Sequence, residues 1–169
     1  MAEYTKRRNV NRGYMKLDVW QKGIELYKLV WHMVSDAKID YKLRGQISDA
    51  TQSVSANIAE GYSRRSIKEY LQHLYIALGS LSESLSRMIA FYAAGQITPE
   101  QFEQFDALYY EVENKLWNLV RSLEEKKLDG TWIDHVSEDT ADYTIYQSDS
   151  QGKQPDDNPN KHNKDSPIQ

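Results

Sequence analysis

The side chains best suited to chemistry are a histidine and two arginines near the middle of the chain. Arg64 and Arg65 precede His73 with eight and seven residues between them. In RNA-cleaving helical proteins an arginine polarises the phosphate while a histidine transfers protons. The separation here is longer than such proteins use, so the motif is not met. An RNA-processing enzyme that uses His73 with Arg64 or Arg65 is kept as an alternative hypothesis.

A second candidate chemistry is metal binding by Glu69 and His73, which lie four residues apart on one helical face. Di-iron helical bundles repeat such ligands on a second pair of helices, and this sequence holds no duplicate. Glu69 is better explained as a helix-capping partner, and His73 as a surface or interface residue. The sequence also lacks cysteine, a glycine-rich phosphate loop, His-Glu-x-x-His and Gly-x-Ser-x-Gly. We therefore expect no catalytic residue, no cofactor and no bound metal, and we expect that the protein is not an enzyme.

A junction at residues 53–66 and just beyond combines small, polar and basic residues around a helix break. The cationic side chains that would contact RNA or another acidic partner are Arg64, Arg65 and Lys68. The alternative is that they are only solvated charges at an exposed turn. The other distinctive residues, to which we assign a structural role in the turn, are Asn57, Glu60 and Gly61.

Apolar residues that recur every three or four positions predict four amphipathic helices, which position these side chains. The most regular repeat starts after the capping pair Ser66 and Glu69, stops at Gly95, and comprises Ile67, Leu71, Leu74, Leu78, Leu81, Leu85, Met88 and Tyr92. The next repeat, after the start signals Thr98, Pro99 and Gln101, comprises Phe102, Phe105, Tyr109, Val112, Leu116, Leu119 and Leu123. The first repeat, ending near Asp36, comprises Leu17, Trp20, Ile24, Tyr27, Trp31 and Val34. The second repeat, closed by Gly61, comprises Leu43, Ile47, Ala50, Val54 and Ile58.

Short connections restrict how these helices pack. The links span roughly residues 37–41, 61–65 and 95–97, and such short links force neighbouring helices to run antiparallel. The predicted fold is therefore all-α, an antiparallel up-down-up-down four-helix bundle. The alternation of three- and four-residue steps favours left-handed packing at crossing angles of about 20°.

Composition divides the chain into a basic N-terminal extension (1–15), the four-helix bundle (16–128) and an acidic C-terminal tail (129–169). The tail holds 3 of the 21 basic and 9 of the 25 acidic groups, so residues 1–128 carry a charge of +2. We expect a disordered tail, with a recognition segment at 131–146 that docks on the bundle or a partner as the less favoured alternative. The absence of a signal peptide, of a long apolar span and of cysteine predicts a soluble, cytoplasmic protein.

Apolar residues exceed what one interior face can bury. Those off the principal faces are Leu26, Leu29, Val30, Leu108, Trp117 and Val120. The serine-rich run at 79–86 alternates with core leucines and would flatten one helix surface for close contact with another helix, within the chain or from another subunit. A second buried surface of this kind indicates self-association into a closed homo-oligomer.

Three segments carry a resemblance to a known family. Residues 16–22 read Lys-Leu-Asp-Val-Trp-Gln-Lys, residues 57–62 read Asn-Ile-Ala-Glu-Gly-Tyr with Arg64-Arg65 soon after, and residues 75–81 read Tyr-Ile-Ala-Leu-Gly-Ser-Leu. Over roughly residues 12–127 the chain resembles the bacterial four-helix bundle proteins related to those encoded in 23S rRNA intervening sequences. The resemblance implies a ring-like homopentamer of up-down bundles, with no established enzyme activity and no catalytic residues. It also implies a distant kinship with the accessory variability proteins of diversity-generating retroelements, whose similar rings bind a reverse transcriptase and RNA.

Residues and resemblance together favour a non-enzymatic, homo-oligomeric scaffold or interaction protein that is associated with RNA or the ribosome. Its expected partners are other copies of the chain, and RNA or an RNA-binding protein, with no membrane contact. The alternatives are the RNA-processing enzyme described above and an accessory subunit of a reverse transcriptase.

Overall fold

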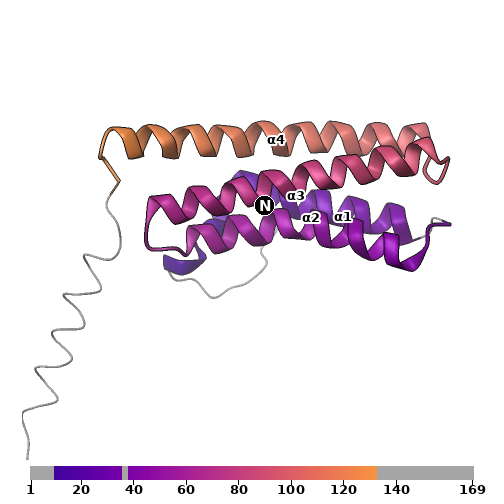
Figure 1. Cartoon of the computed structure of the whole chain (residues 1–169), viewed down its shortest axis with the longest axis horizontal. Helices are drawn as coiled ribbons and strands as arrows, with labels where there is room; N and C mark the ends of the chain where they lie inside the picture. The colour runs from indigo at the N-terminus through magenta and orange to yellow at the C-terminus, as the bar shows by residue number, and fades with distance from the viewer. Residues whose placement is uncertain (1–9, 36–37, 133–169) are drawn as a thin grey trace, which may run out of the picture. The chain divides into compact units, whose positions relative to one another are not determined.

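The structure, a computed structural model, describes residues 10–35 and 38–132. Within these residues the chain forms one short 3-10 helix and four α-helices, and no strand (Figure 1). Their bounds are η1 Val10–Lys16, α1 Asp18–Ser35, α2 Tyr41–Tyr62, α3 Ile67–Ala93 and α4 Pro99–Leu128. The predicted all-α, four-helix fold is confirmed. None of the helices in this part of the chain is long and apolar enough to cross a membrane.

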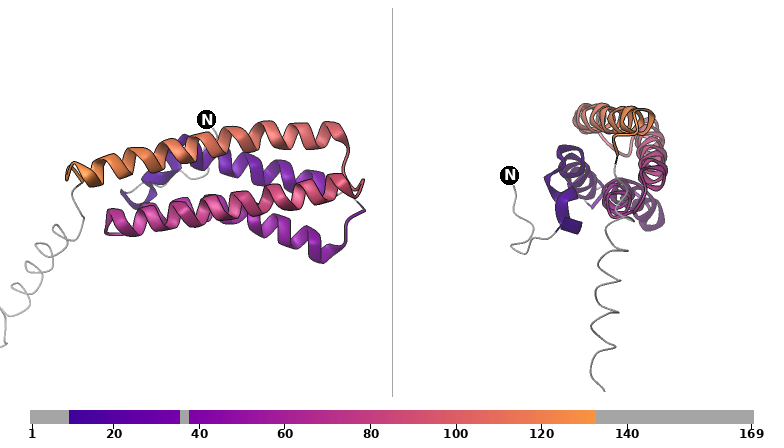
Figure 2. Two further views of the ribbon diagram at one scale, coloured as in Figure 1. Left: turned by 45° about the horizontal axis from the view of Figure 1, so that its top comes forward. Right: turned by 90° about the vertical axis from the view of Figure 1, so that its left-hand side faces the viewer.

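The four α-helices surround one core, and each packs against two neighbours in the order α1, α2, α3, α4 and back to α1 (Figure 2). Between α2 and α3, rising residue numbers in one helix pair with falling numbers in the other: Gln46 with Arg87, Ser53 with Ser80, and Asn57 with His73. The same sense holds between α1 and α4, where Asp18 pairs with Lys115 and Lys22 with Glu111. These neighbouring helices therefore run antiparallel.

Local signals set the helix ends. At the start of α4, the Thr98 hydroxyl accepts the Gln101 amide at 3.2 Å and the Gln101 side chain accepts the Thr98 amide at 2.9 Å, which completes the predicted capping box. Ser66 caps α3 by accepting the Glu69 amide, and the Glu69 carboxylate accepts the Ser66 hydroxyl. Gly95 ends α3 with a φ of +66°, in the left-handed region that favours glycine.

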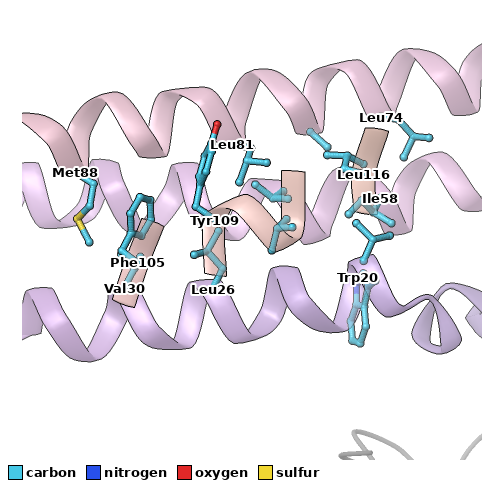
Figure 3. Close-up of a cluster of buried hydrophobic side chains, with 14 of the residues drawn as sticks. Trp20, Leu26, Val30, Ile58, Leu74, Leu81, Met88, Phe105, Tyr109 and Leu116 are labelled. Atoms are coloured by element: carbon cyan, nitrogen blue, oxygen red, sulfur yellow. The ribbon is translucent and has the colours of Figure 1, made fainter. Parts of the chain in front are cut away.

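The core consists of large apolar side chains that all four helices direct inward (Figure 3). Leu26, Val30, Phe105 and Leu116 are each 0% exposed. Complete burial of such a side chain contributes roughly 1.5–3 kcal/mol. The core thus provides the main stabilisation that fixes the four helices relative to one another.

The face that α1 turns to the core differs from the predicted one. Leu26 and Val30, which we expected outside the principal face, are completely buried, whereas Trp31 is 51% exposed. Val120 of α4, also expected outside, is 0% exposed. The prediction was wrong because α1 is apolar around much of its circumference, so steps of three and four residues fit more than one stripe.

The packed region extends past both predicted bundle boundaries. Tyr14 and Met15 of η1, which we assigned to the N-terminal extension, pack against the core. Trp132, which we assigned to the tail, also packs against the core, with its ring 6.4 Å from that of Tyr70. The rest of the predicted tail, residues 133–169, lies outside the described residues.

Candidate functional site

The predicted site residues meet where the end of α2 faces the start of α3. Arg64 Nε donates a hydrogen bond to His73 Nε2 over 3.1 Å. Arg64 Nη2 is paired with the Glu60 carboxylate, and the same carboxylate oxygen lies 3.8 Å from His73 Nε2. Arg64 and His73 are nine positions apart in the sequence, and the α2–α3 turn brings them into contact.

The His73 ring is held by α2 on its other side. Its Nδ1 lies 3.4 Å from Asn57 Oδ1, while Asn57 Nδ2 donates to the carbonyl and hydroxyl oxygens of Ser53 at 2.8 and 2.9 Å. The Ser80 hydroxyl of α3 donates to Ser53 Oγ at 3.1 Å. A continuous set of contacts thus joins the two helices. We call it the α2–α3 polar network, and its members are Ser53, Asn57, Glu60, Arg64, His73 and Ser80.

These contacts determine what His73 can do. Because Nε2 accepts from Arg64, the hydrogen-bond pattern assigns the proton of a neutral ring to Nδ1, where it faces Asn57. Both ring nitrogens therefore have a partner within the chain. The arrangement is suited to holding α2 and α3 in register.

Gly61 has a different role from the predicted one. It lies inside α2, which continues to Tyr62 and is capped by Ser63, so the prediction that Gly61 forms the turn is wrong. A Cβ at position 61 would lie 2.8 Å from His73 Cβ and 2.8 Å from Tyr70 Cδ2. Glycine stands here because α2 and α3 approach each other too closely for a side chain.

The predicted cationic patch is divided by its surroundings. Arg64 is committed to the α2–α3 polar network, where Glu60 balances its charge. Arg65 at the turn and Lys68 at the start of α3 are exposed, as Arg64 is. Glu69, beside them, caps the helix with Ser66, and the described residues hold no group of three or more His, Cys, Asp or Glu that could bind a metal ion. Of the three predicted cations, Arg64 is thus the one that belongs to the α2–α3 polar network.

Aromatic rings close the same end of the bundle. They contact one another in the order Trp20, Tyr14, Tyr62, Tyr70 and Trp132, with centroids between 5.3 and 6.4 Å apart. Tyr70 is 4% exposed. Its burial, with a smaller contribution from Tyr62, raises the pKa of its hydroxyl. The phenol therefore stays neutral and serves in packing.

Two members of the α2–α3 polar network, Ser53 and Ser80, carried no individual prediction. The sequence predicts only that their small side chains let two helices approach each other closely. Ser53 lies four residues before Asn57, and side chains at this spacing meet on a helix, so the sequence did hold a signal for that contact. Ser80 lacked such a signal, because its partner belongs to another helix.

Comparison with known proteins supports the same fold. A solved structure of a protein with unknown function from the S23 ribosomal protein family of Bacteroides thetaiotaomicron has a TM-score of 0.57 to this chain at 22% identity, and the match covers 61% of this chain and 95% of that one. At this identity the likeness shows the fold alone. No curated protein matches the sequence. The family described as 23S rRNA-intervening sequence protein matches residues 15–118, more than half of the chain and all of the α2–α3 polar network. The chain therefore belongs to the 23S rRNA-intervening sequence protein family.

Proposed function

We propose that this protein is a non-enzymatic, homo-oligomeric scaffold that self-associates through the outward face of α3. The observation that carries the proposal is an exposed, uncharged row of residues, which we call the α3 stripe: Tyr75, Gly79, Ser82, Ser86, Ile89 and Ala93. Their alternating steps of four and three residues are the spacing at which one helix packs along another. The α3 stripe is therefore suited to contact with a helix of a second copy.

Gly79, near the centre of the α3 stripe, has no evident packing role within a single chain. A Cβ at Gly79 would meet nothing within 4 Å, so no contact inside the bundle requires glycine there. Glycine in a helix interior costs about 1 kcal/mol relative to alanine. A close approach by another backbone would explain its presence. Ser82 and Ser86 keep the surface shallow along the same line.

Large apolar side chains add to this surface. Tyr75 and Ile89 are 45% and 47% exposed, and Ile76 beside them is 45% exposed. Trp117 of α4 is 39% exposed, with its ring 6.5 Å from that of Tyr75. Removing such surface from water stabilises a complex by about 25 cal/mol per Å², and closed symmetric oligomers are the common way to hide it. A ring of five copies is the state that the family resemblance implies.

Further features support the other parts of the proposal. The engagement of both His73 nitrogens supports a non-catalytic role. The family description, together with the exposed Arg65 and Lys68, supports association with RNA, the ribosome or an RNA-binding protein. The lack of cysteine is compatible with the cytoplasm, where we place the assembly.

Light scattering on the purified full chain tests the assembly. We expect a mass near five times the 19.7 kDa of one chain. Gly79→Glu combined with Ile89→Glu should shift that mass toward one chain, because the interface would have to bury two unpaired carboxylates. Asn118→Glu places a single carboxylate at an exposed position of α4 and should leave the mass unchanged. A wild-type protein that is monomeric at micromolar concentration, or stripe variants that assemble normally, would contradict the proposal.

The contact between Arg64 and His73 is the one observation that favours the alternative of an RNA-processing enzyme. That alternative requires cleavage of an RNA substrate, such as a 23S rRNA fragment, by the wild-type protein and loss of cleavage in His73→Ala. No cleavage by the wild type, or cleavage that survives in the variant, excludes His73 as the catalytic residue.

A further inference from the structure

The joined ends of α1 and α2 form a pocket that neither the α3 stripe nor the α2–α3 polar network includes. Its volume is about 310 Å³, at the lower end of the range for small-molecule sites. The residues that shape it include Trp31, Val34, Ser35, Tyr41, Arg44 and Gly45. All of them belong to α1 or α2, so a single chain forms the pocket.

Two aromatic side chains provide walls that are open to solvent. Trp31 is 51% exposed and Tyr41 is 78% exposed. The Tyr27 ring lies 6.2 Å from that of Trp31 and supports it from within α1. Exposed aromatic faces stack favourably on flat ligands, including nucleobases. The walls therefore favour a planar ring over a flexible chain.

Gly45 keeps one side of the pocket open. It lies within α2, where a Cβ would meet nothing within 4 Å. Packing of the bundle does not require glycine at this position, and helix interiors disfavour it. Because Gly45 lines the pocket, a longer side chain there would occupy the space available to a ligand.

Arg44 supplies the polar group. Its Nη1 donates to the Ser35 carbonyl at 3.3 Å, whereas its buried Nε has no hydrogen-bond partner. A buried donor without an acceptor is unfavourable and uncommon in native proteins. A guanidinium binds carboxylates and phosphates through two parallel donors. An anionic group in the pocket would give the Arg44 guanidinium an acceptor.

We propose that this pocket binds a small planar aromatic compound that carries an anionic group. The ring stacks against Trp31 and Tyr41, and the anionic group pairs with Arg44. Two kinds of compound share this chemistry, nucleoside monophosphates and aromatic carboxylates. The pocket volume accommodates one such molecule and excludes larger folded ligands.

Isothermal titration calorimetry on the full-length protein tests the proposal with adenosine 5′-monophosphate and indole-3-acetate as probes. We expect at least one of them to bind with a Kd below about 1 mM. Its uncharged counterpart, adenosine or indole, should bind at least about tenfold more weakly because the pairing with Arg44 is lost. Binding of the adenylate alone identifies a nucleotide site, and binding of the indole acid alone identifies a carboxylate site.

Three variants locate the binding. Gly45→Leu should abolish it by filling the pocket, while Gly45→Ala, the matched control, should retain it. Arg44→Gln should remove the preference for the anionic probe over its uncharged counterpart. Helical circular dichroism confirms that each variant is folded. The proposal is overturned if neither probe binds, if Gly45→Leu binds as the wild type does, or if Arg44→Gln keeps the preference for the anionic probe.

Discussion

Replacing Gly61 with alanine tests the close packing of α2 against α3. The new methyl group would lie 2.8 Å from His73 Cβ, 2.8 Å from Tyr70 Cδ2 and 3.2 Å from the Tyr70 carbonyl oxygen. None of these atoms is the free end of a flexible side chain, so the two helices must separate. Overpacking of this kind costs about 1–3 kcal/mol, while alanine gains up to about 1 kcal/mol of helix propensity. We expect the free energy of unfolding to fall by about 1–2 kcal/mol.

Urea unfolding followed by circular dichroism, at one fixed protein concentration, measures this change. Gly45→Ala is the matched control, because the same methyl group meets nothing within 4 Å at that position. It should raise the free energy of unfolding by about 0.5–1 kcal/mol. The two alanine variants should thus move in opposite directions. A Gly61→Ala protein as stable as the wild type would refute the steric reasoning, because the helices would then accommodate the methyl group without cost.

Three further predictions concern the core, a cap and high pH. Leu26→Ala removes a completely buried side chain and should lower the free energy of unfolding by about 2–5 kcal/mol in the same urea titration. Trp31→Ala should lower it much less. The reverse order would favour the α1 face predicted from the sequence. Thr98→Ala removes the cap of α4 and should lower stability by about 1 kcal/mol. Thr98→Ser keeps a capping hydroxyl and should retain most of that stability. Equal stability of the wild type and both variants would show that the cap contributes nothing. Burial, reinforced by the Glu113 charge, raises the pKa of Tyr109 to about 12, while a phenol in the unfolded chain ionises near pH 10 with a pKa of about 10. The stability that the neutral phenol contributes is therefore complete below about pH 10 and is lost as the pH rises to about 12. Tyr109→Phe should reduce the slope of the free energy of unfolding against pH in that window. An unchanged slope would exclude Tyr109 as its source.

Helix ends could be predicted from the sequence because their causes are local. The Thr98 and Gln101 side chains satisfy amides within one turn of their own helix, and the conformation of Gly95 depends on little beyond its missing side chain. Such signals can be recognised without knowing which helix packs against which. The four-helix fold follows from them together with the apolar repeats.

Contacts between helices were harder to predict, because they depend on how each helix is rotated about its axis. The apolar residues of α1 permit more than one rotation, and the choice that buries Leu26 and leaves Trp31 exposed is made by the neighbouring helices. The contact of Arg64 with His73 shows the same limit. A spacing rule measured along one helix does not describe two residues that face each other across a turn.

The close approach of α2 to α3 at Gly61 also has a consequence for how the protein moves. These two helices pack more closely than any other neighbouring pair in the described part of the chain, and hydrogen bonds join them from Gln46 to His73. Contacts of this density delay local opening, so backbone amides of α2 and α3 should be the last to exchange with solvent deuterium. The α3 stripe therefore lies on the hairpin that opens least often. In the assembly that we propose, a surface held this still would lose little conformational entropy on binding a second copy, which favours slow dissociation.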